Sequence, residues 1–441
     1  MSAKAWATMN AVDIITKKKD GKILSPEELE YMVMGYTRGE IPDYQMSALL
    51  MAIVLNGMTR EETVRLTEIM RDSGEVMDLS GIKGIKVDKH STGGVGDKTT
   101  LIAAPIAAAA GVPIAKMSGR GLGFTGGTVD KMEAIPGFRT SMTREEFINS
   151  VNTGGIAVIG QTGRIAPADK KIYALRDVTG TTQSLALITS SIMSKKLAAG
   201  AHNIVLDVKI GSGAFMKTEE DGRTLARKMV DIGKSFGRNI AAVVTNMDRP
   251  LGFAVGNSLE VLEAVSVLKN ESRGDLRDIC VALASNLLSL CYGWSEEESE
   301  ARANEAIESG ATLEKFKEWI TAQGGDASFV DDPSLLGKAE YTFEFKAERD
   351  GYISHMNAET IGKTASVLGA GREKKTDDID HTAGIILKRK TGDYVKKGET
   401  IALFYTSKEE SEKAAAEMFS SAVDFSDESP VEKPLVYGVI K

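Results

Sequence analysis

Two glycine-rich segments carry most of the polar groups that could bind an anion. KHSTGGVGDKTT (89–100) and KMSGRGLGFTGGTVDKME (116–133) each follow a β-prone run and open a helix. Glycine lets the backbone approach an anion closely, and the N–H groups at a helix start point toward it. Loops that follow parallel strands leave the same edge of the sheet, so these two can converge. The pattern predicts a small tetrahedral anion held by Lys89, Ser91, Thr100, Ser118 and Thr128.

These loops do not by themselves identify an enzyme. A tight strand-to-helix turn without a ligand is also rich in glycine, and the spacing matches neither a P-loop nor a dinucleotide-binding fingerprint. A third polar cluster, Arg176 with Ser191 and Lys195, lies in a helical stretch. Ser191 and Lys195 are four residues apart and share a helix face, while Arg176 offers a planar fork of donors. Taken alone, these three residues are typical of a solvated surface.

The composition limits the classes of partner. The chain has 441 residues, 42% of them apolar and 26% charged, which is typical of a soluble protein with two or three domains. Its net charge of −8 argues against non-specific binding to nucleic acid or anionic membranes. The sequence shows no signal peptide, and its most apolar run is interrupted by Pro105. We therefore expect a cytoplasmic protein.

The elements that must position these residues change character along the chain. The first seventy or so residues predict short helices, including MSALLMAIVLNG (46–57), which is apolar nearly all round and is expected to be buried. From Gly84, β-prone runs alternate with helices, which predicts a largely parallel sheet. The fold class is mixed α/β. We expect a small helical domain (1–75 and 165–199), a larger α/β domain (83–160 and 201–340) and a β-rich C-terminal subdomain (345–441).

The run SGRGLGFTGGTVDKMEAIPG (118–137) resembles the signature of the thymidine and pyrimidine-nucleoside phosphorylases. KHSTGGVGDK resembles the phosphate loop of that family, and YALRDVT and SSIMSKK resemble its base-binding segments. The resemblance extends from about Val12 into the β-rich tail. It implies a homodimer formed through the helical domain, with the active site between that domain and the α/β domain. It also implies inorganic phosphate as co-substrate and no organic cofactor.

The resemblance assigns roles to individual residues. It implies phosphate binding by Lys89, Ser91, Thr100, Lys116, Ser118 and Thr128. It implies a pyrimidine site of Tyr173, Arg176, Ile188, Ser191 and Lys195. The catalytic residues would be His90, Arg176 and Lys195. It also implies a potassium ion bound by Gly96, Lys98, Leu251, Ala254 and Glu263, although the family often has threonine where Lys98 stands, and an ammonium there could weaken or replace the ion.

The implied reaction is the reversible phosphorolysis of uridine, thymidine or deoxyuridine to a free base and a pentose 1-phosphate. A thymidine-restricted enzyme remains an alternative, because the residues do not separate these substrates. An anthranilate-type phosphoribosyltransferase shares the architecture, but a suitable acidic pair for magnesium pyrophosphate is missing after Lys195. A carrier domain is a further alternative, since the segment 392–399 resembles a biotinyl or lipoyl hairpin, but the modified lysine turn of such domains is not present.

Overall fold

The computed structural model describes residues 9–121, 126–161, 163–372 and 377–441. The chain divides into two compact units. The smaller unit comprises Met1–Leu79, Gln161–Ala201 and Arg227–Arg238, and the larger comprises Ser80–Gly160, His202–Ala226 and Asn239–Lys441. Among the residues described, no helix combines the length and the apolar character needed to cross a membrane.

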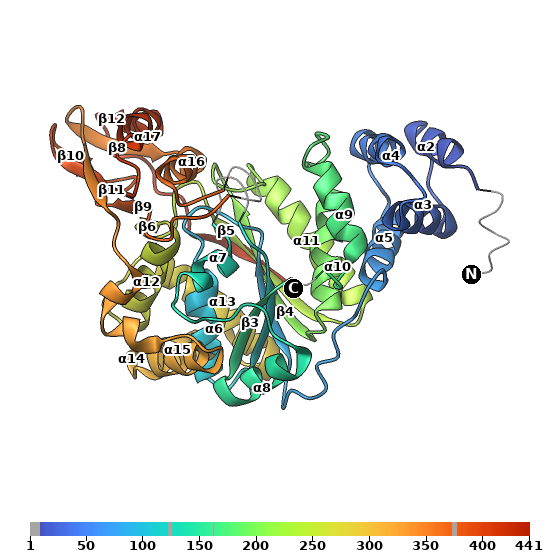
Figure 1. The fold of residues 1–441 in the computed structure, drawn as a ribbon, viewed down its shortest axis with the longest axis horizontal. Helices are drawn as coiled ribbons and strands as arrows, with labels where there is room; N and C mark the ends of the chain where they lie inside the picture. The colour runs from blue at the N-terminus through green and yellow to red at the C-terminus, as the bar shows by residue number, and fades with distance from the viewer. Residues whose placement is uncertain (1–8, 122–125, 162, 373–376) are drawn as a thin grey trace. The chain divides into compact units, whose positions relative to one another are not determined.

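The smaller unit is helical, as its labelled elements show (Figure 1). Its helices are α2 (Ala11–Lys19), α3 (Pro26–Arg38), α4 (Asp43–Asn56), α5 (Arg60–Asp72), α9 (Pro167–Arg176) and α10 (Leu185–Ala198). Ser25 with Glu28, and Thr59 with Glu62, form capping boxes that begin α3 and α5, because each pair satisfies backbone N–H groups that the first helical turn leaves free. The segment 161–201 packs with the N-terminal helices around one apolar core.

Helix α4 is only partly buried, which differs from the expectation that its apolar sequence would be enclosed. Leu49, Leu50 and Ile53 are buried, whereas Tyr44 is 74% and Leu55 75% exposed. Tyr44, Ala48, Met51 and Leu55 follow one another at helical spacing, so they form a single exposed stripe. A helix that is apolar all round can therefore carry a second apolar face that its own unit does not cover.

The larger unit is built on a six-stranded sheet in the order β13-β5-β4-β1-β2-β3. The strands are β1 (Val87–Ser91), β2 (Ile114–Ser118), β3 (Ile156–Gly160), β4 (Asn203–Ile210), β5 (Asn239–Asn246) and β13 (Val436–Ile440). All neighbouring pairs are parallel except β13 with β5, so β1 to β5 end on one side, which we call the carboxyl edge. Loops that begin there are the positions where α/β sheets bind ligands.

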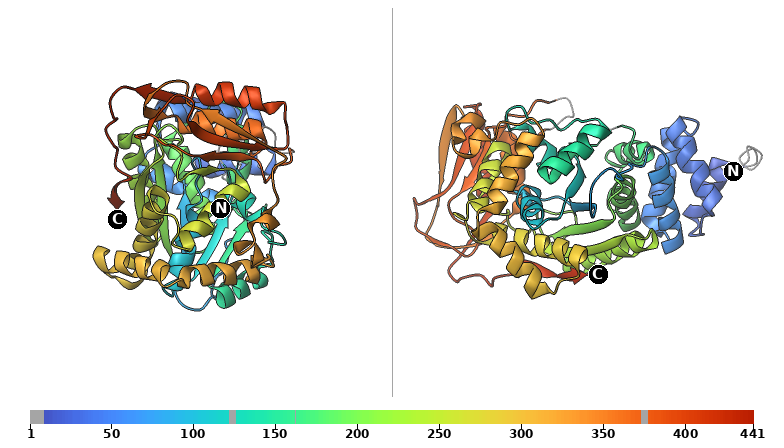
Figure 2. Two further views of the ribbon diagram at one scale, coloured as in Figure 1. Left: turned by 90° about the vertical axis from the view of Figure 1, so that its left-hand side faces the viewer. Right: turned by 90° about the horizontal axis from the view of Figure 1, so that it is seen from below.

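Helices surround this sheet, as the two further views show (Figure 2). They are α6 (Thr99–Ala109), α7 (Thr128–Glu133), α8 (Arg144–Gly154), α11 (Glu219–Ser235), α12 (Asn257–Leu268), α13 (Asp275–Tyr292), α14 (Glu296–Glu308) and α15 (Ala311–Ala322). Two short 3₁₀ helices follow, at Ala327–Val330 and Pro333–Leu336. Helix α6 contains Pro105 and is buried along almost its whole length, which explains its almost wholly apolar sequence.

The C-terminal region forms two small antiparallel sheets, β10-β8-β12 and β6-β9-β11-β7. Their elements are β6 (Ala254–Val255), β7 (Tyr341–Lys346), β8 (Gly351–Met356), α16 (Ala358–Leu368), β9 (Gly384–Leu387), β10 (Tyr394–Val395), β11 (Thr400–Thr406), α17 (Ser411–Ser420) and β12 (Val423–Ser426). These units confirm the expected fold class. Three strands depart from the expected boundary at residue 345, because β7 spans it, β6 joins a C-terminal sheet and β13 joins the central sheet.

Candidate active site

The strands β1 and β2 bring two lysines and two serines to the carboxyl edge. Val87 of β1 pairs with Ile114 of β2 in parallel. Residues two apart on a strand share a face, so Lys89 and Ser91 leave one face of β1, and Lys116 and Ser118 leave one face of β2. Four of the six phosphate-binding residues expected from the sequence therefore lie on two neighbouring strands.

Lys89 lies in a buried network of charges. Its side chain is 1% exposed, and its Nζ donates to Thr99 Oγ1 and lies 3.4 Å from Asp207 Oδ2. Lys209 Nζ lies 2.8 Å from the same carboxylate oxygen, and Thr245 Oγ1 donates to the other one at 2.6 Å. Burial lowers the pKa of Lys209, but the carboxylates of Asp207 and Asp97 outweigh it and hold the pKa above its ordinary value. The network holds the ammonium groups of Lys89 and Lys209 in fixed positions beside the first glycine-rich loop.

Asp207 and Lys209 are site residues that the sequence reasoning missed. They lie two apart on β4, a strand whose residues are all buried, so both point to the face that carries Lys89. Buried charges are rare unless they are paired, so two of opposite sign at this spacing are themselves a signal. That signal was available in the run NIVLDVKI.

The two glycine-rich loops meet at Lys131. Its Nζ donates to Asp97 O of the first loop (92–98) at 2.9 Å and to Gly126 O of the second loop (119–127) at 3.1 Å. The same ammonium lies 3.1 Å from Glu260 Oε2. Residues 122–125 of the second loop lie outside those the structure describes. A single buried ammonium thus joins the described parts of both loops, as their convergence on one edge requires.

Asp130 holds the start of the second loop. Its Oδ2 accepts from Gly121 N at 2.6 Å, and its Oδ1 accepts from Arg372 Nη1 at 2.7 Å. Gly127 closes the loop so tightly that a Cβ there would lie 2.0 Å from Gly121 N. Glycine is therefore required at position 127, and the adjoining Asp130 and Lys131 are loop-holding residues rather than anion ligands.

The surroundings of Thr100, Thr128, Lys116 and His90 differ from one another. Thr100 is buried in the first turn of α6, and Thr128 is the first residue of α7. Lys116 is 2% exposed, and its Nζ donates to Lys89 O and lies 4.0 Å from Asp88 Oδ1. His90 lies between Lys89 and Ser91 on β1, so its half-buried side chain leaves the opposite face of the sheet from theirs.

In the smaller unit, α9 and α10 bring the expected base-binding residues together. Arg176 is 2% exposed, and its guanidinium donates to the carbonyl oxygens of Thr181 at 3.1 Å, Thr182 at 2.9 Å and Leu187 at 3.2 Å. Burial lowers the pKa of Arg176. A guanidinium has five N–H donors, so two remain for another acceptor. The carbonyl contacts fix the plane in which those donors lie.

Lys195 is held between two helices. Its Nζ lies 2.6 Å from Asp169 Oδ2 and 2.8 Å from Ser191 Oγ. The Tyr173 ring lies 5.8 Å from both the Lys195 ammonium and the Arg176 guanidinium carbon. Burial raises the pKa of Tyr173. Ile188, half-buried on α10, precedes Ser191 by three residues and therefore shares its face.

Asp169 is a further residue that the sequence reasoning missed. It is 3% exposed, and its Oδ1 has no hydrogen-bond partner in the described part of the chain. Asp169, Tyr173 and Arg176 follow one another on α9 at spacings of four and three, which places them on one face. This spacing is the feature of the sequence from which Asp169 could have been predicted to lie beside the base-binding residues. The carboxylate orients the ammonium of Lys195.

The residues expected to bind potassium do surround a cation, but the cation is Lys98 itself. The Lys98 side chain is fully buried, and its Nζ donates to Leu251 O, Ala254 O and Glu263 Oε2. Gly96 O accepts from the backbone N–H of Lys98 at 2.9 Å. The expectation of a potassium ion therefore needs correction, because these oxygens are already bound to an ammonium and the residues present do not fit an additional ion of the same sign.

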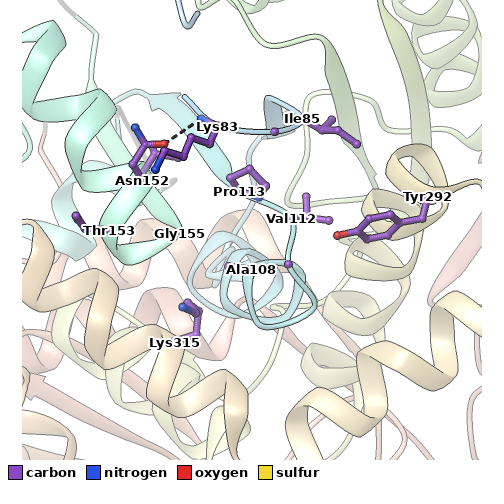
Figure 3. A pocket seen from close by; sticks show the side chains of 13 residues that line it. Lys83, Ile85, Ala108, Val112, Pro113, Asn152, Thr153, Gly155, Tyr292 and Lys315 are labelled. Atoms are coloured by element: carbon purple, nitrogen blue, oxygen red, sulfur yellow. Dashed lines mark hydrogen bonds between the residues drawn. The ribbon is translucent and has the colours of Figure 1, made fainter. Parts of the chain in front are cut away.

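A pocket of about 420 Å³ lies away from all these groups (Figure 3). Its lining includes Pro113 just before β2 and Gly155 just before β3, so it adjoins the starts of the strands rather than their carboxyl edge. The lining contains none of the residues expected to bind phosphate or base. This pocket is not the candidate active site.

Comparisons with known families define the class of the protein. The description "Glycosyl transferase family, a/b domain" matches residues 83–313, and "Glycosyl transferase family, helical bundle domain" matches residues 12–74. "Pyrimidine nucleoside phosphorylase C-terminal domain" matches residues 352–426. The chain therefore has the α/β domain and the helical bundle domain of this glycosyl transferase family.

Individual relatives narrow this class. The chain is 54% identical over 403 residues to a pyrimidine-nucleoside phosphorylase of Geobacillus stearothermophilus, covering 91% of this chain and 93% of the relative. It is 53% identical over 414 residues to one of Bacillus subtilis (strain 168), covering 94% and 96%. The chain belongs to the pyrimidine-nucleoside phosphorylase family, which confirms the family that its motifs indicate.

One solved structure shares the fold at low identity. The anthranilate phosphoribosyltransferase of Thermus thermophilus aligns with a TM-score of 0.56 and 20% identity, covering 70% of this chain and 99% of that one. At this identity the likeness concerns the fold alone. It accounts for the architecture shared with the alternative considered from the sequence, and it adds nothing in favour of that chemistry.

Proposed function

We propose that this enzyme catalyses the reversible phosphorolysis of pyrimidine nucleosides, converting uridine, thymidine or deoxyuridine with inorganic phosphate into the free base and ribose or deoxyribose 1-phosphate. The enzyme is thus a pentosyltransferase. The observation that carries this proposal is the single ammonium of Lys131 joining both glycine-rich loops at the carboxyl edge. Family membership supports the choice of pyrimidine nucleosides over other glycosides.

Phosphate binds at the carboxyl edge in this proposal. Backbone N–H groups of the first loop and the start of α6 supply donors, and hydroxyl groups surround the anion. The side chains assigned to phosphate are Lys89, Ser91, Thr100, Lys116, Ser118 and Thr128. Both lysines are buried and held by protein oxygens, so they act through a fixed positive potential rather than by reaching out.

The base binds at the helical cluster in this proposal. Arg176 and Lys195 donate to the carbonyl oxygens of the pyrimidine, Ser191 adds a hydroxyl, and Tyr173 and Ile188 supply flat apolar surface. Cleavage of the glycosidic bond builds positive charge on the sugar and negative charge on the departing base. The phosphate dianion stabilises the first charge and attacks, while Arg176 and Lys195 stabilise the second.

No protein nucleophile is needed, because phosphate forms the new bond to the sugar. The protein contributes position, worth roughly 7–11 kcal/mol in well-oriented reactions. It also contributes aimed donors, each worth about 3–4 kcal/mol. His90 donates a hydrogen bond or a proton to a base oxygen. His90→Ala is expected to lose mainly turnover, and Arg176→Ala and Lys195→Ala are expected to lose more.

A substrate assay tests the proposal. Uridine, thymidine and cytidine are each incubated with phosphate, and release of the free base is followed. We expect uridine and thymidine to react and cytidine to fail, because the 4-amino group of cytidine presents donors to the donors of Arg176 and Lys195. Reaction of thymidine alone would restrict the enzyme to thymidine. Full activity of Arg176→Ala would contradict the base site.

We further propose that the protein is a homodimer that acts in cytoplasmic nucleoside salvage. The exposed stripe of α4, formed by Tyr44, Ala48, Met51 and Leu55, supports a second copy as the partner, since isologous contacts repeat the same patch on both subunits. Sedimentation of Leu55→Glu should show monomers. Val178→Glu changes a residue that is 79% exposed and lies outside α4, and should leave the dimer intact. A monomeric wild type would contradict this assembly.

A further inference from the structure

The ammonium group of Lys98 is surrounded by oxygen acceptors. It stands at the N-cap position of α6, directly before the helix that carries Thr99 and Thr100. Its Nζ donates to Leu251 O at 2.9 Å, to Ala254 O at 2.9 Å and to Glu263 Oε2 at 2.5 Å. An ammonium has three N–H donors and no acceptor, so every donor of Lys98 is used.

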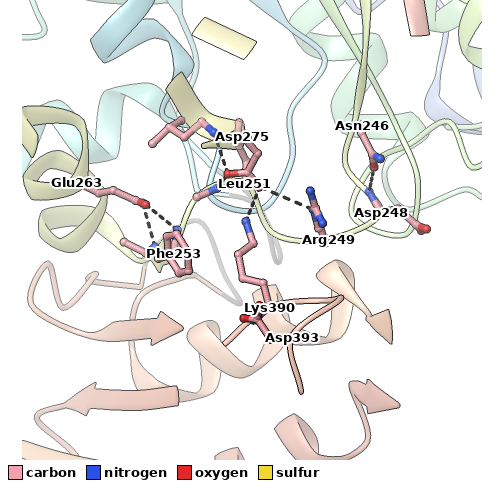
Figure 4. Close-up of polar contacts among 12 residues, drawn as sticks. Asn246, Asp248, Arg249, Leu251, Phe253, Glu263, Asp275, Lys390 and Asp393 are labelled. Carbon is pink, nitrogen blue, oxygen red and sulfur yellow. Dashed lines mark hydrogen bonds and ion pairs between the residues drawn. The ribbon is translucent and has the colours of Figure 1, made fainter. Parts of the chain in front are cut away.

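The acceptors belong to a loop that α12 holds in shape. Glu263 of α12 accepts from Phe253 N at 2.6 Å and from Ala254 N at 2.9 Å (Figure 4). At Gly96, whose φ is +73°, a Cβ would lie 2.5 Å from Leu251 O. The first loop and the segment 251–254 therefore meet too closely for a side chain at position 96. The Lys98 side chain reaches into the space among these oxygens.

The same loop is bound to the first glycine-rich loop by its backbone. Leu251 N donates to Val95 O at 3.1 Å. On its other side, Lys390 Nζ contacts the carboxylate of Asp275, and Asp275 Oδ1 accepts from Gly252 N at 3.3 Å (Figure 4). The ammonium of Lys98 thus connects α6 and the first loop to the segment 251–254, which is itself held on two sides.

Resting on the proposed phosphorolysis, we infer that Lys98 is a built-in monovalent cation: its ammonium takes the place of a bound potassium ion in holding the first loop, and this enzyme is independent of potassium. Backbone carbonyls and a carboxylate are the oxygens that replace the hydration shell of such an ion. The ammonium carries the same single charge at the centre of the same oxygens. An ion and Lys98 Nζ exclude each other there, by volume and by charge.

A tethered cation differs from a dissolved one in two ways. It is present at high effective concentration whatever the salt outside, because it is part of the chain. It also presents three N–H donors in fixed directions, and these are accepted by the carbonyl oxygens of Leu251 and Ala254 and by the carboxylate of Glu263. Phosphate binding by the first loop therefore does not vary with the potassium concentration.

The test compares wild type with K98T in potassium chloride and in tetramethylammonium chloride at matched ionic strength. Threonine removes the ammonium and leaves a neutral hydroxyl oxygen, so a potassium ion can enter. Two quantities are measured: the thermal midpoint, and kcat/KM for phosphate. K390T is the matched control, because Lys390 is also buried, carries the same charge and lies near the same loop, but contacts Asp275 rather than the Leu251 and Ala254 carbonyls.

We expect wild type to be the same in both salts. K98T should lose about tenfold in kcat/KM for phosphate in tetramethylammonium, mainly through KM, and regain most of it in potassium. Its thermal midpoint should rise with potassium, as for any ligand that binds only the folded state. K390T should show no such response to potassium.

Two results would overturn the inference: a wild type that loses activity or thermal stability without potassium, or a folded K98T that does not respond to potassium. If K98T fails to fold, the comparison of wild type in the two salts still tests whether the enzyme is independent of potassium. The thermal measurement needs no turnover, so it also separates this inference from a failure of the proposed reaction.

Discussion

The charges at the carboxyl edge and the charges on α9 and α10 are held in different ways. At the edge, Lys89, Lys209 and Asp207 are all within 1% of full burial, and both lysines form ion pairs with Asp207. On the helices, Lys195 keeps 20% of its side chain exposed and has one carboxylate partner, Asp169. The edge is preorganised by a closed network, whereas the helical cluster keeps donors available for a neutral, flat ligand.

Because of this difference, we expect substitutions at the edge to affect mainly the free energy of unfolding, and substitutions in the helical cluster to affect mainly turnover. A closed buried network loses folding free energy when one member is removed, because the remaining charges stay buried without partners. A partly exposed donor can be removed with a larger effect on turnover than on folding. Three substitutions test the comparison and a fourth tests a contact outside both regions; they follow from the largest expected effect to the smallest.

Asp207→Asn should have the largest effect. It leaves Lys89 and Lys209 buried beside a neutral amide, so we expect a loss of about 3–5 kcal/mol in the free energy of unfolding. Urea unfolding measures it. The control is Thr245→Val, which removes one hydrogen bond to the same carboxylate and should cost about 1 kcal/mol. Equal effects of both variants would show that the network does not act through charge.

Lys195→Met should lower kcat by about 10²–10³, because it removes an aimed donor. It also leaves Asp169 buried without its cation, so the thermal midpoint should fall. Adding Asp169→Asn should restore the midpoint and leave the activity low. Recovery of activity in this double variant would show that Lys195 serves only to neutralise Asp169.

Asp169→Asn alone should lower kcat/KM for the nucleoside by about tenfold, equivalent to about 1.4 kcal/mol. The amide can still accept from Lys195, but it no longer holds the ammonium by charge. The value of KM for phosphate should stay constant, since Asp169 belongs to the helical cluster. Steady-state kinetics with each substrate varied in turn gives the KM for the nucleoside and the KM for phosphate separately. An equal rise of both KM values would contradict the placement of Asp169 in the base site.

His355→Asn should have the smallest effect, and only on stability. His355 Nε2 lies 3.6 Å from Asp248 Oδ1, and this contact raises the pKa of the histidine above its ordinary 6.5. The folded state therefore binds the proton more tightly than the unfolded state. The contribution is complete below pH 6.5 and is lost as the pH rises through the folded pKa. As the pH rises through this range, the thermal midpoint should fall less steeply in His355→Asn than in wild type.

The sequence predicts the carboxyl edge better than the helical cluster. Glycines between a strand and a helix have few structural explanations, so the two loops and the strands β1 and β2 could be placed from their pattern. Arg176, Ser191 and Lys195 carry no such pattern, and only the family motifs identify them. Asp169 escapes because an acidic residue in a first helical turn usually serves the helix itself.

Contacts that depend on long-range packing could not be predicted. The motifs name Lys98, Leu251 and Glu263 together, but not that the lysine side chain turns into the space among them, since the contact joins residues 153 and 165 positions apart. Similarly, the exposed stripe of α4 and the place of β13 depend on which surfaces other segments cover. Apolar periodicity indicates that one face of an element is buried, but it does not show which other segment packs against that face.

The position of β13 has a consequence for handling the protein. Val436–Ile440 shields the outer side of β5, whose other side pairs with β4. Deleting those five residues would leave the backbone N–H and C=O groups of a long, apolar strand open to solvent, and such strands recruit further chains. We expect the shortened protein to aggregate under conditions where the full chain stays dispersed, so an affinity tag is better fused to the other terminus.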